Sequence, residues 1–496
     1  MSDIAQEQSH GQLGSSDGRA DEAVVARFPW LTNRRIVFFV LGWMLLFGAI
    51  SAFISNPFQS EPSAAAAPVY WHVMFLHGLL IGIVALGALI ACDVFELRSR
   101  HVRVWIALGA LGATIPVAVG GIFDKGVPGY EVPMWIQIVG FFAFDEILLT
   151  LLIGFALDYR RRAPVSRTLP FIGATLATAS LFVAAVMGHL AGWLLEFGLK
   201  PGIVRSFAKS IGYTKAGDWS AALVGSHSHE MAVAAMALIV TLVARQFGYQ
   251  SLQGAQRRLA QLGLIMVPIG VLAMSYVYVR AGFSTWVPPA WFTSHGGKDG
   301  IASDDVITGV FVMFGGLLVL GSFALVAAGK LGSVRRLPVR AAAIWSWILS
   351  FMTVTVAGYS IELNTTHFGA GDPHANGAAN DAVFTWLHQD LGLFMLPALA
   401  LVMVVVERLI ASRHHGPIGR AVITGTSIGF IGSVVYVFVD TARHGPGYVI
   451  TSIGLAIIGA TLLATIWWGT IRGYSPRPPQ APGGAAPAQP VPGTSA

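Results

Sequence analysis

Long apolar blocks separated by short polar stretches fill the chain between residues 27 and 473. A helix of about 20 apolar residues crosses the hydrocarbon core of a bilayer, and each block reaches roughly that length. The blocks lie at 35–55, 69–92, 102–121, 133–157, 168–197, 219–244, 260–280, 305–328, 340–362, 383–406, 418–440 and 448–470. The pattern predicts an all-α polytopic membrane protein, a single bundle of about twelve transmembrane helices.

Two polar or low-complexity tails flank this bundle. Residues 1–26 are rich in Ser, Gly and Gln, and residues 474–496 consist mainly of Pro, Ala and Gly without periodicity. Such segments cannot bury enough apolar surface to offset the entropy lost on folding. We therefore expect both tails to be disordered.

Composition and charge agree with a lipid environment. Hydrophobic residues make up 54% of the chain and charged residues 11%, whereas soluble domains carry about 25% charged residues. The net charge of +6 does not indicate a nucleic-acid partner, because the basic residues lie between apolar blocks. With both termini in the cytoplasm, the inner segments hold 23 of the 31 Lys and Arg residues, as the positive-inside rule requires. We expect a bacterial inner-membrane protein with both tails cytoplasmic.

Histidine inside a membrane-spanning helix is uncommon and usually functional. Six occur here, at His72 and His77 in the second segment, His189 in the fifth, His227 and His229 in the sixth, and His388 in the tenth. At 1.5 Å per residue, all six lie roughly 5–15 Å below the outer boundary of the bilayer. Unrelated core histidines would have no reason to share one depth on four separate helices. The shared depth therefore favours histidines that hold a prosthetic group.

His227 and His229 are two residues apart, so they point about 200° apart around a helix. They cannot share one small ion on an intact helix, but each can serve a different site. His72 and His77 are about 140° apart and also face different neighbours. This arrangement is typical of axial haem ligands. The alternative for each histidine is a neutral imidazole hydrogen-bonded to a neighbouring helix.

Other polar residues lie at similar depths. Carboxyl groups in hydrocarbon are costly and tend to be protonated or paired, which makes Glu146 and Glu230 candidates for proton transfer during catalysis. Asp145 and Asp390 could orient imidazoles or only fix helix packing. Arg280, at the outer end of the seventh segment, is a suitable partner for a haem propionate.

The helix count and histidine layout resemble the catalytic subunit of the haem-copper oxidase and nitric oxide reductase superfamily. In that resemblance, His227 and His229 match the HxH pair that ligates two haems, and His72 or His77 matches the ligand on helix 2. The HxH pair here lies on the sixth segment rather than the tenth, and no adjacent His-His pair occurs in the seventh. The string from His227 to Met231 is also similar to the HxHEM stretch of NnrS-type membrane haem-copper proteins.

These features together predict a haem-dependent membrane oxidoreductase acting on a small gaseous acceptor such as oxygen or nitric oxide. The haem would be b-type, because Cys92 is the only cysteine and a CxxCH attachment motif is absent. The resemblance implies that copper or non-haem iron could accompany it, with His227, His229 and His388 as candidate metal ligands. Electrons would come from a quinol or a separate donor protein. Two alternatives remain open, a proton-coupled or metal-ion transporter and a non-catalytic protein that holds or senses haem or copper.

Overall fold

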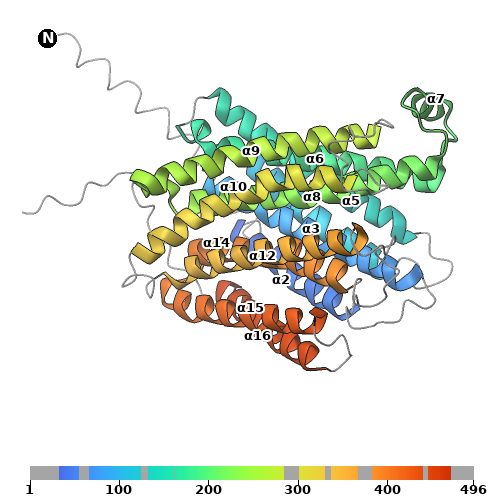
Figure 1. The fold of residues 1–496 in the computed structure, drawn as a ribbon. Coiled ribbons are helices and arrows are strands. Elements are labelled where there is room, and N and C mark those ends of the chain that lie inside the picture. Colours follow the sequence, from blue (N-terminus) through green and yellow to red (C-terminus); the bar gives the residue numbers. More distant parts are fainter. Residues whose placement is uncertain are drawn as a thin grey trace, which may run out of the picture.

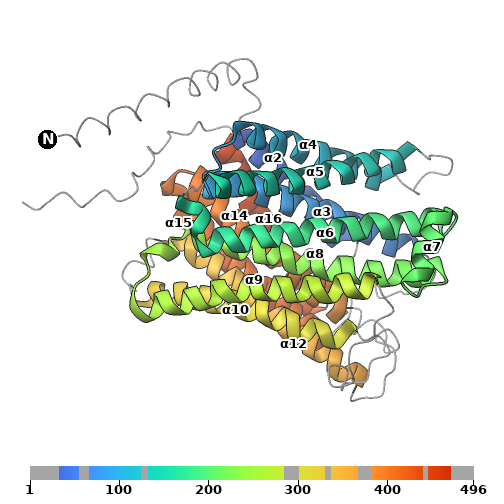
Figure 2. The ribbon, with the colours of Figure 1, turned by 90° about the horizontal axis from the view of Figure 1, so that it is seen from above.

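The computed structural model describes residues 33–54, 66–123, 132–161, 164–283, 301–329, 337–366, 382–438 and 445–470. Over these residues the protein is a bundle of long helices that run roughly side by side (Figures 1 and 2). The two predicted tails lie outside the described residues.

Each of the twelve predicted apolar segments coincides with a helix. The first six long helices are α2 (Asn33–Ile54), α3 (Ala66–Val94), α4 (Arg100–Phe123), α5 (Val132–Arg160), α6 (Leu169–Phe197) and α8 (Ala216–Gln246). The remainder are α9 (Gly254–Phe283), α10 (Ile301–Gly329), α12 (Pro338–Thr366), η3 (Ala382–Met395) running into α14 (Leu396–Leu409), α15 (His415–Phe438) and α16 (Pro446–Thr470). Short helices α7 (Gly202–Ser210), η1 (Pro164–Arg167), η2 (Tyr249–Ser251) and η4 (Ser412–His414) lie in the connections.

Nine helices within the described ranges are long and apolar enough to cross a membrane, which indicates an integral membrane protein. Helices α2, α4 and α10 do not reach the same threshold over their described residues, and the apolar part of α10 covers Val310–Val326. The prediction of about twelve spans therefore stays a prediction.

The percentage of buried residues in each apolar helix distinguishes helices at the centre of the bundle from those at its edge. Within their spanning windows, 78% of residues are buried in α3 and α8 and 88% in η3 with α14, against 22% in α16. Helix α8 packs against α6, α9, α10, α14, α3 and η3. The sixth predicted segment is thus an inner helix over most of its length, although Val224, just before its two histidines, is 46% exposed.

Small residues allow the closest helix pairs to pack. Helix α15 lies directly against α16, and a Cβ added at Gly454 would collide with the backbone of Gly429. Helices in lipid associate through such close backbone contacts, because lipid provides no hydrophobic force to bring them together.

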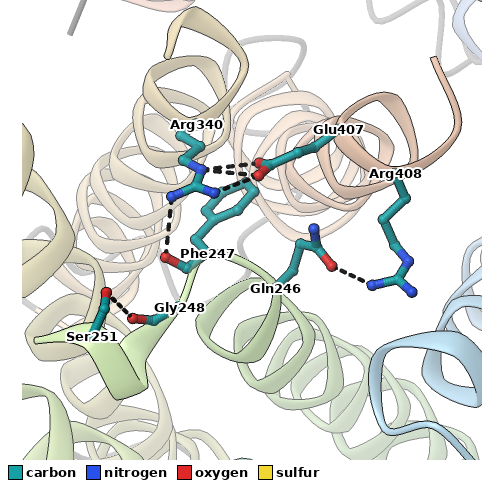
Figure 3. A network of polar contacts seen from close by, with 7 residues as sticks. All are labelled: Gln246, Phe247, Gly248, Ser251, Arg340, Glu407 and Arg408. Carbon is teal, nitrogen blue, oxygen red and sulfur yellow. Dashed lines mark hydrogen bonds and ion pairs between the residues drawn. The ribbon is translucent and has the colours of Figure 1, made fainter. Parts of the chain in front are cut away.

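Charged side chains tie several helices together at the end of the bundle where α8 finishes (Figure 3). Arg340 of α12 forms a bidentate pair with Glu407 of α14, with a shortest N–O distance of 2.6 Å, and also donates to the carbonyl oxygen of Phe247. The neighbouring Arg408 donates to Gln246 Oε1 at 2.6 Å. These bonds link α12, α14 and the end of α8.

Candidate functional site

Helix α8 carries His227 and His229, and the two side chains contact different neighbours. His227 contacts α6 and α3, whereas His229 stacks on α9 and interacts with η3. This divergence follows from their two-residue spacing, which places them about 200° apart around the helix. We call the group around His227 the first histidine site and the group around His229 the second histidine site.

In the first histidine site, His227 faces His77 of α3. Their ring centroids are 6.1 Å apart and their planes differ by only 13°. The Nδ1 atom of His227 lies 2.7 Å from the carbonyl oxygen of Ala184 on α6, and it donates the hydrogen because a carbonyl only accepts. This bond selects the tautomer whose lone pair is on Nε2.

Residue 188 on α6 makes room for the His227 ring. A Cβ built at Gly188 would lie 2.7 Å from both Cε1 and Nδ1 of His227, closer than real Cβ contacts allow. The glycine follows Ala184 by four residues, so both face α8 from the same side of α6. A small-residue face on α6 therefore accommodates the imidazole.

A contact between a histidine and a carboxylate lies beside this site. His189 Nε2 is 2.6 Å from Asp145 Oδ2, which joins α6 to α5. Phe141 of α5 packs edge-on against both His77 and His189, with centroid distances of 5.7 and 6.1 Å. His189 also interacts electrostatically with His227. The first histidine site thus includes three imidazoles and one carboxylate from four helices.

The second histidine site lies on the opposite side of α8. The ring of His229 stacks on Tyr278 of α9 at a centroid distance of 5.7 Å and an interplanar angle of 14°. Its Nδ1 donates to the carbonyl oxygen of Gly225 at 2.8 Å. His388 lies near His229 and near the backbone of Val354. His388 lies in η3, a π-helical segment, and such segments are rare and often found at functional sites.

Glu230 occupies the junction of α6, α8 and α9 and is fully buried. Its Oε1 accepts from Ser180 Oγ of α6 at 2.9 Å, and Ser180 Oγ lies 2.8 Å from Ser275 Oγ of α9. Within the described residues, Glu230 Oε2 and the buried Ser226 Oγ have no hydrogen-bond partner. A buried polar atom of this kind is uncommon and calls for a proton, water or ligand.

Two predicted residues lie away from both sites. Glu146 follows Asp145 on α5 but accepts from Thr150 at 2.8 Å and faces Gly109 of α4 instead of the histidines. Arg280 is exposed and donates to Tyr276 at 2.9 Å, whereas Tyr278 faces the second histidine site from the buried side of α9.

Two further predictions concern His72 and a shared metal site. His72 lies on α3, but its side chain is outside the described residues. Among the side chains that the structure describes, no three His, Cys, Asp or Glu residues form a group that could hold a metal ion. His227 does not join His229 and His388, in agreement with the divergence expected from the sequence.

Sequence reasoning missed Tyr278, Gly188 and the serines around Glu230. One signal was present, because Ser180, Ala184 and Gly188 are small residues spaced four apart on one face of α6. Small residues at this spacing mark close helix contacts in membranes. No comparable signal identifies Tyr278, which looks like an ordinary interfacial tyrosine.

Comparisons with protein-family models, curated proteins and solved structures found no match for this chain.

Proposed function

We propose that this protein is a membrane-bound haem oxidoreductase in which His77 and His227 would hold one b-type haem. The observation that carries the proposal is the pair of near-parallel rings, 6.1 Å apart. Two imidazoles from different helices therefore lie close enough to serve one prosthetic group.

The hydrogen bond at His227 supports the same assignment. Metal-binding histidines usually donate their second ring N–H to a carbonyl or carboxylate, which fixes the ring and the tautomer. His227 makes this bond to Ala184 and keeps Nε2 for a ligand. A haem needs only two protein ligands, so a pair of histidines suffices. When bound, a haem held by two histidines would supply one-electron transfer, and a gaseous acceptor such as oxygen or nitric oxide would need the second cofactor proposed below.

Residues near His77 and His227 would accept and release protons. We propose that His189 Nε2, held by Asp145, exchanges a proton as charge changes at the first histidine site. Glu230, one turn from His227 on α8, would hold a proton at Oε2 within the junction of α6, α8 and α9. These groups replace Glu146 as the nearest candidates, since Glu146 faces α4.

The second histidine site is a candidate for a second cofactor, either another haem or the copper or non-haem iron that the resemblance implies. His229 and His388 are its candidate ligands, and Tyr278 orients the His229 ring. Arg280 lies on the exposed side of α9, away from His229. The predicted contact between Arg280 and a haem propionate would therefore require a propionate that reaches this exposed side.

The wider setting belongs to the same proposal. It comprises about twelve spans in a bacterial inner membrane, both termini in the cytoplasm, and electrons from a quinol or a separate donor protein. Both histidine sites would then lie in the outer half of the bilayer, near the side opposite the termini.

The test is a reduced-minus-oxidised absorption spectrum and a haem extraction on the purified protein. We expect b-type haem bands, and we expect His77→Ala and His227→Ala each to remove most of the low-spin signal. His101→Ala is a matched control, because His101 is exposed at the start of α4. A protein without haem, or two variants with the spectrum of the parent, would overturn the proposal.

The two alternatives give different results in the same preparation. A protein that only holds or senses haem would bind oxygen or nitric oxide in stopped-flow experiments without turnover. A transporter would exchange substrate in vesicle counterflow without bound haem.

A further inference from the structure

The connection between α6 and α8 contains an amphipathic helix, α7, which lies at one end of the bundle (Figures 1 and 2). Its inner side is firmly attached. Ala208 is fully buried, and Val204 packs against a small apolar cluster that includes Leu194 and Trp219. The Trp219 indole donates to the carbonyl oxygen of Gly282 at 2.7 Å. Helix α7 therefore packs against the end of the bundle through Val204 and Ala208.

The same helix exposes two large apolar side chains, although the ring of Phe207 also contacts Trp219 at a centroid distance of 5.9 Å. Ile203 is 86% exposed and Phe207 is 46% exposed. They are four residues apart and so lie on one face. The adjoining end of α6 is also apolar on its surface, with Trp193 at 46% and Leu195 at 70% exposure. Aromatic and apolar residues at the end of a spanning helix are typical of the membrane interface.

Basic residues occupy the other side of the helix. Arg205 and Lys209 are exposed, and at 100° per residue they lie on the side of α7 away from Ile203. Lys200 and Lys215 flank the helix, while Asp218 is the only acidic residue between positions 198 and 218. In the predicted orientation these four are half of the basic residues on the outer side, where Lys and Arg are normally sparse.

We propose that α7 is an interfacial helix that lies in the headgroup layer of the outer leaflet and binds anionic phospholipid. Ile203 and Phe207 would enter the boundary between headgroups and acyl chains, and Arg205 and Lys209 would contact lipid phosphates. An apolar face beside basic residues is what binding to an anionic bilayer surface requires. An acidic soluble protein would use the same charges but would leave Ile203 in water. Only a short turn, from Gly198 to Pro201, separates α7 from the spanning helix α6.

The single native cysteine simplifies the test. Cys92 is buried at 1% exposure, so a cysteine introduced on α7 reacts selectively with an environment-sensitive fluorophore. The full chain carrying Ile203→Cys is reconstituted into vesicles of phosphatidylethanolamine with phosphatidylglycerol, and separately into phosphatidylcholine vesicles. Phe207→Cys is the second reporter of the apolar face, and Arg205→Cys is the matched control on the opposite face.

In the anionic vesicles we expect blue-shifted emission at positions 203 and 207, with strong quenching by lipids that carry a quencher high on the acyl chain. The probe at position 205 should instead be quenched by aqueous iodide. Combining Arg205→Gln and Lys209→Gln with Ile203→Cys should reduce the blue shift at least twofold. Equal iodide quenching at positions 203, 207 and 205 would overturn the interfacial placement. The same blue shift in both vesicle types, unaffected by the two Gln substitutions, would overturn the binding of anionic lipid. Neither readout depends on haem.

Discussion

At the scale of single residues, the imidazole of His227 fits between α8 and α6 because residue 188 has no side chain. The ring would come within 2.7 Å of a Cβ at that position, and the Ala184 carbonyl one turn away fixes its Nδ1. Ring position and tautomer are thus both determined by α6. Such preorganisation lets a ligand bind without reordering the side chain.

Gly188→Ala should therefore disturb the first histidine site. The added methyl group displaces the His227 ring, so we expect a shifted haem spectrum and haem content lowered severalfold. Gly192→Ala is the control, because a Cβ at Gly192 meets nothing within 4 Å. Absorption spectra of the two variants, normalised to protein, provide the measurement. Equal haem content and identical spectra in both would contradict this account of the site.

At the scale of helices, the Arg340–Glu407 pair is a connection that can be measured. Arg340 stacks over the Phe247 ring at 5.4 Å while it binds Glu407 in bidentate geometry, so it joins three helices (Figure 3). Bidentate guanidinium–carboxylate pairs are stronger than ordinary surface pairs. Solvent weakens the pair, because the Arg340 side chain is 35% exposed.

A double-mutant cycle with Arg340→Ala and Glu407→Ala should give a coupling energy of about 1 kcal/mol. Unfolding of the detergent-solubilised protein by denaturant supplies the four free energies. Arg413→Ala is a suitable control, since Arg413 is exposed at the same end of the bundle and contacts its neighbour His414. Additive effects of the two substitutions would mean that the pair does not stabilise the fold.

The helices themselves could be predicted from the sequence, because each is a long apolar block bounded by polar residues. The divergence of His227 and His229 was also predictable, since helical geometry alone determines it. The pairing of His77 with His227 was not, because it depends on how α3 and α8 pack across 150 residues of chain. The contact between Asp145 and His189 was not predictable either, because it depends on how α5 and α6 are rotated about their axes. A helix that is apolar on all sides gives no sign of which side faces its neighbour.

At the scale of the whole molecule, the helices place α2 against α16, so the first and last long helices are neighbours. With an even number of spans, the chain begins and ends on the same side of the membrane. From the distribution of the basic residues we expect that side to be the cytoplasm.

This topology predicts that reporters fused to either terminus report the cytoplasm, whereas a reporter inserted between α6 and α8 reports the opposite side. A fluorescent protein that matures in the cytoplasm and a phosphatase active only outside it provide the two readouts. Fusions after α2, α4 and α10 are the decisive ones, because these helices were not among the nine apolar spans. Termini on opposite sides would rule out an even number of spans.

The shared position of the two histidine sites on α8 has a mechanical consequence. One rigid helix carries both imidazoles on opposite flanks, so a rotation about its long axis moves them in opposite directions. A group bound at one site that rotated α8 would therefore displace the histidine of the other site as well.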